Sequence, residues 1–396
     1  MKILIGLLYI YLIFPYIGLF FYHGFGGSVS SEMKVLYFIH IFIEISIVTF
    51  FLVVFFNKKE NISFYISCKK YKRILFKSFF ILIAVLFINL FVFKNYHILL
   101  GDIGRGEFRT TLHFGFIYNF FSYYLPGGIL AFNSYLFTKV KCAKYRLFLL
   151  YILAMLLGFL TGFKSTAIFI ALMGLAGLSP ILKFKNLIVF SILGVFLMAV
   201  SAYKFMHFND FWDTFNYLFK RATAIAVDGT VGVYNNFPNG GNESYMILLY
   251  NLGNKLASLI TGYSKDSIEF LKIDLGRHIG YLTYPSEVAK EAITGAFNLT
   301  ITNFGEAIYL FGKNFFWIYS LIVSFYIGFI IYLYKYADLL LKTVLIVYFI
   351  TALDVGGGRI TNIFAFTTII YLLVLYFVLE FIYNKIKIWR KDYESD

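Results

Sequence analysis

The sequence predicts an all-α, polytopic integral membrane protein. Of its 396 residues, 60% are hydrophobic and only 14% are charged, whereas roughly a quarter of the residues in a soluble protein are charged. The mean hydropathy is +0.77. Apolar runs such as residues 35–56 reach the roughly 20 residues that a helix needs to cross a bilayer, and they lack the alternation of β-barrel strands. We therefore expect about ten (9–12) transmembrane helices and one large extracytoplasmic loop domain.

The apolar runs form two groups that one long polar segment separates. Hydropathy predicts spans at 3–22, 35–56, 78–96, 114–137, 147–163, 166–182, 186–206, 307–333, 341–354 and 360–383. The predicted domains are an N-terminal bundle of about seven helices at 1–206, an outside loop at 207–304, about three helices at 305–384 and a basic tail at 385–396. The first apolar run has no small-residue cleavage site after it, so we expect a retained helix.

The long loop is predicted to be partly helical. Residues 229–244 are rich in Gly and Asn, which is typical of a loop. Residues 244–260 instead have the apolar spacing of a helix. We expect this segment to fold against the membrane surface.

Basic residues cluster in short loops, and this clustering predicts the orientation of the chain. The net charge is +14. The clusters are Lys58, Lys59, Lys69, Lys70, Lys72, Arg73 and Lys77; then Lys139, Lys141, Lys144 and Arg146; then Lys385, Lys387, Arg390 and Lys391. Basic short loops stay on the cytoplasmic side, so both termini are predicted to be cytoplasmic and nucleic-acid binding is disfavoured. Cys68 and Cys142 lie in these loops and imply neither a disulfide nor a cysteine-based metal site.

A second set of cations falls on the predicted outer side, against the usual trend. Its members are Arg105, Arg109, Lys164, Lys220, Arg221, Arg277 and Arg359. Guanidinium groups bind phosphate through two hydrogen bonds, so a convergent set would suit a diphosphate or an acidic sugar. Any one of these cations taken alone is better explained by a lipid headgroup or by a loop acid, whereas the set taken together favours a binding site. His278, beside Arg277, is predicted to be a hydrogen-bonding partner.

The sequence lacks the motifs of several enzyme classes. The six histidines have no metal-ligand spacing, and no Walker or GxSxG pattern occurs. Residues 355–359, VGGGR, are predicted to form a flexible turn. The first outside loop, residues 23–34, lacks the acidic pair usual in mannosyltransferase-type membrane enzymes. We therefore expect no metal and no cofactor.

The stretch NFGEAIYLFG, residues 303–312, places Glu306 where the polar loop meets an apolar run. Together with an Arg-containing outside loop before the fourth span, a Gly-x-basic-Ser turn at 162–165 and spaced arginines in the long loop, it resembles the O-antigen (repeat-unit) polymerase family, Wzy. Members often have a segment similar to iGExYxxFG before the span that follows the large loop. Lys164 stands where an Arg is common, and ten spans is fewer than many members have.

The resemblance implies an inner-membrane glycosyltransferase with a periplasmic active site. Its substrates would be undecaprenyl-diphosphate-linked oligosaccharides, and a chain-length regulator and membrane lipids are candidate partners. Arg221 and Arg277 would stabilise the leaving diphosphate, and Glu306 would be the base or would orient the acceptor hydroxyl. The secondary substrate contacts would be Arg105, Arg109, Lys164, Lys220, His278 and Arg359.

Alternatives remain open for both residues and function. Glu306 is equally explained as a helix-start carboxylate that the helix dipole stabilises. Asp274 and Glu287 are reserve candidates for the base. The chain could instead be an O-antigen ligase, or a flippase or other transporter, although transporters usually have internal repeats, short loops and charges within their spans.

Overall fold

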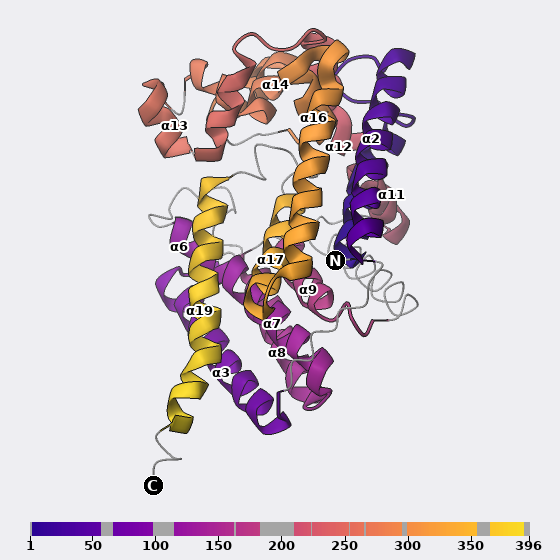
Figure 1. The fold of residues 1–396 in the computed structure, drawn as a ribbon. Helices are drawn as coiled ribbons and strands as arrows, with labels where there is room; N and C mark the ends of the chain where they lie inside the picture. Colours follow the sequence, from indigo (N-terminus) through magenta and orange to yellow (C-terminus); the bar gives the residue numbers. More distant parts are fainter. Residues whose placement is uncertain are drawn as a thin grey trace.

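The computed structural model describes the chain in ten stretches, all of them helical or irregular. These stretches are residues 2–56, 66–97, 115–161, 164–182, 210–222, 224–252, 254–264, 267–294, 299–354 and 365–391. Within them the secondary structure is helical, with no strand (Figure 1). The prediction of an all-α protein is confirmed for these residues.

The helices follow one another in the order that hydropathy suggests. The N-terminal half contains α1 (Lys2–Gly18), α2 (Ser31–Phe56), α3 (Cys68–Phe87), η1 (Ile88–Val92), α6 (Gly115–Asn119), η2 (Phe120–Tyr124), α7 (Leu125–Val140), α8 (Lys144–Leu160) and α9 (Lys164–Gly177). Shorter helices follow: α11 (Phe211–Ala222), α12 (Ala224–Asn236), η3 (Ser244–Leu252), α13 (Asn254–Thr261), η4 (Glu269–Ile273), α14 (Leu275–Thr283) and α15 (Ser286–Thr294). The C-terminal part contains α16 (Asn303–Tyr336), α17 (Leu339–Asp354) and α19 (Phe366–Lys391).

Four described helices are long and apolar enough to cross a membrane. They are Ser31–Phe55, Cys68–Val92, Asn303–Tyr336 and Phe366–Tyr383. Shorter apolar helices cover Ile5–Gly18, Thr166–Gly177 and Leu339–Ala352. The predicted span at 186–206 lies outside the described residues. The chain is therefore a helical membrane protein, and ten spans is a larger number than these long helices alone support.

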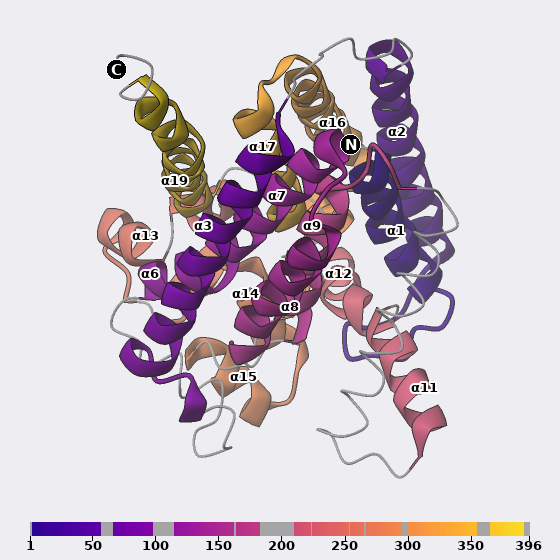
Figure 2. The same cartoon turned by 90° about the horizontal axis from the view of Figure 1, so that it is seen from below.

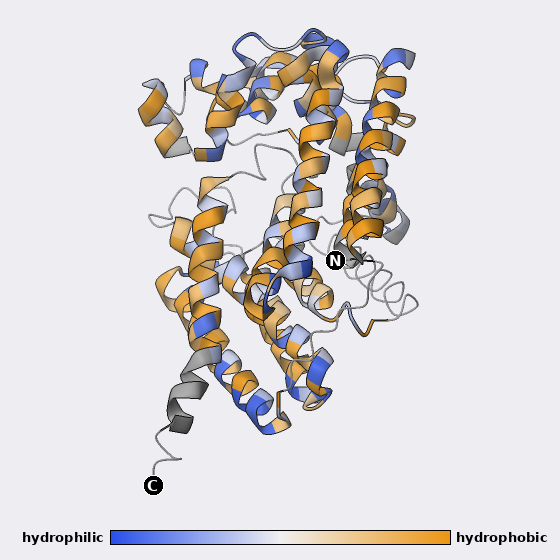
Figure 3. Cartoon of the chain, viewed as in Figure 1, coloured by the Kyte–Doolittle hydropathy of each residue, from blue (hydrophilic) through white to orange (hydrophobic). Residues whose placement is uncertain are grey.

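Large apolar side chains cover the outer faces of the long helices as well as the core. Phe76 and Phe80 on α3 and Phe377 on α19 are 71%, 66% and 65% exposed. In water such surfaces would favour aggregation, whereas lipid solvates them. Figure 3 shows the long helices as mainly hydrophobic along their length.

Helix α7 is the central helix of the bundle and contacts α3, α8, α9 and α17. Figure 2 shows α7 between α3, α9 and α17. Close approach depends on its small residues, since a methyl group added at Gly127 would meet the sulfur of Met173 and one at Gly128 would meet Leu375. Small residues at helix contacts serve this purpose in membrane bundles, where packing replaces the hydrophobic effect between helices.

The two cysteines form a disulfide, which corrects the expectation that they are unpaired. Cys68 begins α3, and Cys142 lies in the turn between α7 and α8. Because α3 packs against both α7 and α8, the Cα atoms of Cys68 and Cys142 lie 6.1 Å apart. The sequence alone could not show this proximity, since 74 positions separate the residues.

The disulfide can be tested with a thiol-reactive polyethylene glycol maleimide on denatured protein. We expect no adduct before reduction and two adducts after it, because both thiols are engaged with each other. Cys68→Ser should release one reactive thiol without reduction. Two adducts on unreduced, freshly denatured wild-type protein would contradict the pairing.

Candidate functional site

The motif NFGEAIYLFG begins α16 and ends in a reversal of the chain. Gly312 has φ 68° and ψ 173°, which are not helical angles. The rings of Phe304 and Phe316 lie 5.8 Å apart, although a straight helix would separate their Cα atoms by about 18 Å. Helix α16 is therefore a helical hairpin. We name residues 303–311 the short arm and residues 313–336 the long arm.

The long arm runs parallel to α2, and polar contacts fix their register. Near the Gly312 end, Lys313 forms an ion pair with Glu32 over 3.1 Å. Further along both helices, the Ser320 hydroxyl lies 2.6 Å from Nδ1 of His40. The two helices continue side by side below these contacts, as Figure 1 shows.

The short arm runs back along the same helix in the opposite direction. The ring of Phe304 stacks on Tyr37 with centroids 4.4 Å apart, and the Asn303 amide donates to Glu44 over 2.8 Å. Ser320 lies eight residues beyond Gly312, and is therefore about 12 Å from the reversal along the axis of the long arm. The start of the short arm thus lies well below the Gly312 end, beside the middle of α2.

The loop 238–241 satisfies the backbone groups that the reversal frees. Lys313 donates its N–H to the carbonyl of Pro238 over 2.8 Å, and Gly241 donates to the carbonyl of Tyr309 over 2.8 Å. Unpaired backbone groups are costly inside a membrane protein. The Gly- and Asn-rich segment of the long loop is therefore the partner of the hairpin tip.

Glu306 lies in the first turn of the short arm and is fully buried, with 0% exposure. Thr302 caps this helix and accepts from the N–H of Gly305. The sequence placed Glu306 at the boundary between the polar segment and an apolar run. In the structure the long arm, α2 and α12 enclose the short arm, and this packing buries the Glu306 side chain.

The rings of Phe237 and His278 lie beside Tyr309, near the Gly312 end of the short arm. Phe237, at the end of α12, lies 5.2 Å from Tyr309 and 5.6 Å from His278, measured between ring centroids. Burial lowers the pKa of His278 to about 4, so its imidazole is neutral at pH 7. The neutral ring can exchange hydrogen bonds but cannot neutralise a phosphate.

Arg277 holds the end of α15 through its guanidinium. Its Nε donates to the carbonyl of Ala292 over 2.7 Å, and Nη2 donates to the carbonyl of Ile293. Its backbone N–H donates to the carboxylate of Asp274, the residue that caps α14. Arg277 is 5% exposed. A cation at a helix C-terminus is stabilising, so the structure gives Arg277 an architectural role.

The remaining predicted residues are placed less fully. Lys220 is exposed near the end of α11, and Glu287 is exposed at the start of α15. Arg221 and Lys164 lie in α11 and α9, with side chains outside the described set. Arg105, Arg109 and Arg359 lie outside the described residues. The structure places the ring of His278 6.3 Å from the ring of Tyr309, which lies three residues after Glu306 on the short arm. The convergence of the cations stays a prediction.

Asp228 on α12 ties the loop between α1 and α2 to the segment between α14 and α15. Its carboxylate is 3% exposed and accepts from the hydroxyls of Tyr22 and Tyr284. It also accepts from the Gly26 N–H over 2.8 Å. Burial and the adjacent Asp228 raise the pKa of Tyr284, so the phenol stays protonated and donates. The sequence offered no signal for this three-way contact, because 202 positions separate Gly26 from Asp228.

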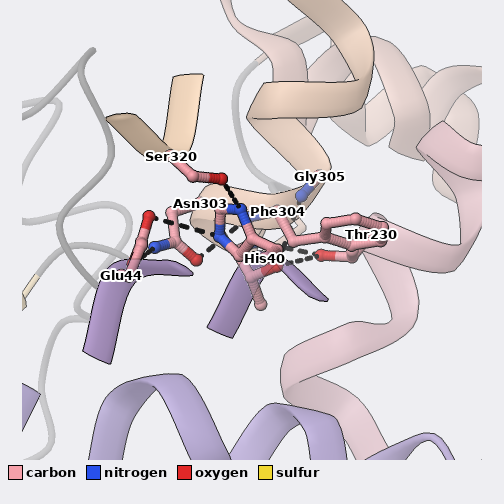
Figure 4. Close-up of polar contacts among 8 residues, drawn as sticks. His40, Glu44, Thr230, Asn303, Phe304, Gly305 and Ser320 are labelled. Carbon is pink, nitrogen blue, oxygen red and sulfur yellow. Dashed lines mark hydrogen bonds and ion pairs between the residues drawn. The ribbon is translucent and has the colours of Figure 1, made fainter. Parts of the chain in front are cut away.

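A buried polar cluster joins α2 to both arms of the hairpin. Figure 4 shows His40 and Glu44 of α2 facing Asn303 of the short arm and Ser320 of the long arm. His40, Glu44 and Ser320 are 0% exposed, and Asn303 is 2% exposed. The sequence carries one signal for this cluster: His40 and Glu44 are four residues apart, and therefore share one helix face.

Comparisons with known proteins found no match to a protein-family model, a curated protein or a solved structure. Among the described residues, no group of three His, Cys, Asp or Glu side chains is placed to hold a metal ion. The hairpin, with Glu306 and the buried cluster, is the candidate site that geometry alone defines.

Replacing Gly312 by Ala should destabilise the protein. An added Cβ would lie 2.7 Å from the carbonyl carbon of Asn239, and the left-handed φ strains any other residue. We expect a loss of about 1–3 kcal/mol in the free energy of unfolding, measured by urea denaturation in detergent. Gly6→Ala is the matched control, since nothing lies within 4 Å of its added Cβ. Equal stability of the two variants would contradict the hairpin.

Arg277→Ala should also lower stability, because the carbonyls of Ala292 and Ile293 lose their buried donors. The expected loss is about 1–3 kcal/mol, measured as a drop in the thermal midpoint. Lys220→Ala removes an exposed cation of the same loop and should change the midpoint little. An unchanged midpoint in Arg277→Ala would leave substrate binding as the better account of this residue.

Proposed function

We propose that the chain is a polymerase of lipid-linked oligosaccharide repeat units. It transfers a growing glycan from undecaprenyl diphosphate onto an acceptor hydroxyl of an incoming lipid-linked unit. The sugar–phosphate bond breaks, a glycosidic C–O bond forms, and the hydroxyl proton passes to a base. The observation that carries the proposal is the position of Glu306: a carboxylate excluded from water in a glycine-broken hairpin at the end of a long, apolar helix.

This environment suits a base for glycosyl transfer. Exclusion of water protects the activated donor from hydrolysis, and a carboxylate with little solvation accepts a proton more readily than one in water. The rings of Phe237 and Tyr309 and the neutral His278 lie at the outer end of the same arm. Aromatic faces of this kind suit the packing of sugar rings. Cations of the outside loops would stabilise the leaving diphosphate.

The proposal includes the finer membrane topology. The chain would have about ten spans, cytoplasmic termini and a site that faces the periplasm of a bacterial inner membrane. Figure 1 shows α13 and α14 at the upper end of the molecule, beside the upper end of α16, while α19 extends towards the lower end. The disulfide opposes one detail of this topology, since disulfides persist mainly in oxidising compartments and Cys68 lies in a loop predicted to be cytoplasmic.

Transport of a lipid-linked oligosaccharide is the second candidate. A specific observation favours it: Glu44 and His40 are fully buried within a span, beside a discontinuous helix. Buried ionisable groups at broken helices are typical of transporters. An O-antigen ligase would share the site proposed for the polymerase and differ in its acceptor.

Reconstitution with purified lipid-linked repeat units separates these classes. We expect wild-type protein to give products of increasing length, and Glu306→Gln to lower the rate at least 100-fold, since general-base catalysis contributes about 10²–10⁴. Glu32→Gln is the matched control, because Glu32 is an exposed acid of the neighbouring helix α2.

Each other outcome identifies an alternative. A normal product ladder from Glu306→Gln would remove Glu306 from the mechanism. Transfer only to a lipid A–core acceptor would indicate a ligase. Movement of the intact lipid-linked unit across the vesicle membrane, with no longer product, would indicate a transporter.

A further inference from the structure

His40 and Glu44 form a buried acid–base pair that the proposed transfer does not use. The Nε2 atom of His40 lies 3.4 Å from Oε1 of Glu44, and both side chains are 0% exposed. Neither atom has a hydrogen bond in the structure. Two buried titratable atoms thus face each other within a helix that is long and apolar enough to span the membrane.

The other polar atoms of the pair are already satisfied by the hairpin. The Oε2 atom of Glu44 accepts from the Asn303 amide over 2.8 Å. The Nδ1 atom of His40 lies 2.6 Å from the Ser320 hydroxyl, which can donate to it or accept from it. The Asn303 side chain also interacts with the His40 ring, and Nε2 and Oε1 are the two atoms of the pair that lack a geometrically defined hydrogen bond.

The surroundings of the pair contain no compensating charge among the described residues. The rings of Tyr37, Phe304, Phe316 and Tyr319 lie around His40, with centroids 5.5–6.4 Å away. The other acids on the packed elements lie elsewhere: Glu32 pairs with Lys313 near the hairpin tip, and Glu306 lies one turn along the short arm from Asn303.

Charge then decides how many protons the pair holds. An ionised Glu44 beside a neutral His40 would bury a net negative charge, which costs several kcal/mol within a membrane. One additional proton makes the pair neutral overall. Separated charges are disfavoured where water is excluded, so the proton belongs on Oε1 of Glu44, donated towards Nε2 of a neutral His40, while Nδ1–H donates to Ser320.

We propose that His40 and Glu44 form an intramembrane binding site for a single proton, and that this proton holds the short arm against α2. Loss of the proton would leave a carboxylate between α2 and the hairpin, directly at Asn303, where the short arm starts. The site therefore links protonation to the position of the arm that carries Glu306. This inference goes beyond glycosyl transfer and applies equally to a transporter.

Infrared spectroscopy of the purified full-length protein in nanodiscs, without substrate, tests the protonation state. We expect a carbonyl-stretch band of a protonated carboxylic acid at neutral pH, and its loss in Glu44→Gln. The amide of Gln reproduces the acceptor and donor of the protonated acid, so this variant should fold. Glu32→Gln should keep the band, and the component of the band that is lost in Glu44→Gln should persist in Glu306→Gln.

A wild-type spectrum without such a band, or a band that Glu44→Gln leaves unchanged, would overturn the proposal. Should Glu44→Gln fail to fold, Asn303→Ala provides the second test. This variant keeps Glu44 but removes the donor to Oε2, so the band should shift. An unshifted band in folded Asn303→Ala would also overturn the assignment.

Amide hydrogen exchange of residues 303–311 tests the link to the hairpin. We expect alkaline pH to accelerate exchange in the wild type at least tenfold relative to Glu44→Gln at the same pH, because only the wild type loses the proton. A purely structural role for Glu44 would instead give equal exchange in both proteins at every pH. Neither measurement involves transferase activity, so failure of the proposed function would leave both readouts intact.

Discussion

The reversal of α16 at Gly312 is the constraint on which the site depends. A span that continued straight from Asn303 would carry Asn303 and Glu306 beyond the outer end of α2. The reversal instead lays the short arm along α2 and brings Asn303 to Glu44. The reversal leaves two backbone groups at the tip without helical partners. The carbonyl of Pro238 accepts from the N–H of Lys313, and the N–H of Gly241 donates to the carbonyl of Tyr309, which offsets this cost.

This arrangement gives the long loop a structural purpose. The loop supplies the segment that closes the hairpin tip, and α12 packs along the short arm so closely that a methyl group at Gly305 would meet Ile301 and Thr230. Asp228, two residues before Thr230 on the same helix, holds the loop between α1 and α2 through the N–H of Gly26. Segments that lie far apart in the sequence are thereby joined around one buried carboxylate, Glu306.

The sequence predicted the class of fold well because lipid imposes a simple rule on composition. Spans need long apolar runs, and α2 matches its predicted range closely, whereas α3 and α19 overlap theirs with shifted ends. Hydropathy could not predict the hairpin, because NFGEAIYLFG and the residues after it are equally apolar in a straight helix and in a reversed one. The positive φ of Gly312 is what turns the chain, and a glycine within an apolar run gives no sequence signal of that angle.

The candidate site was predictable only in part, for a similar reason. Glu306 was identified from its place at the boundary between loop and span, but its enclosure depends on contacts that no local pattern records. Arg277 was selected as an arginine on the outer side, and its guanidinium proves to cap α15. The disulfide and the Asp228 contacts both join residues far apart in the sequence, so spacing could not reveal them.

The two acids of α2 show how position along one helix separates solvated from buried chemistry. Glu32 and Glu44 are on the same helix and contact the two arms of the same hairpin. Glu32, at the tip, meets the ammonium of Lys313, and both side chains remain partly exposed. Such a pair contributes little to stability and is screened by salt. Glu44 meets an imidazole and an amide where water is excluded. There, neutrality can be achieved only with a proton, so the same residue type that is an ordinary surface ion at one end of the interface becomes a proton-binding group at the other.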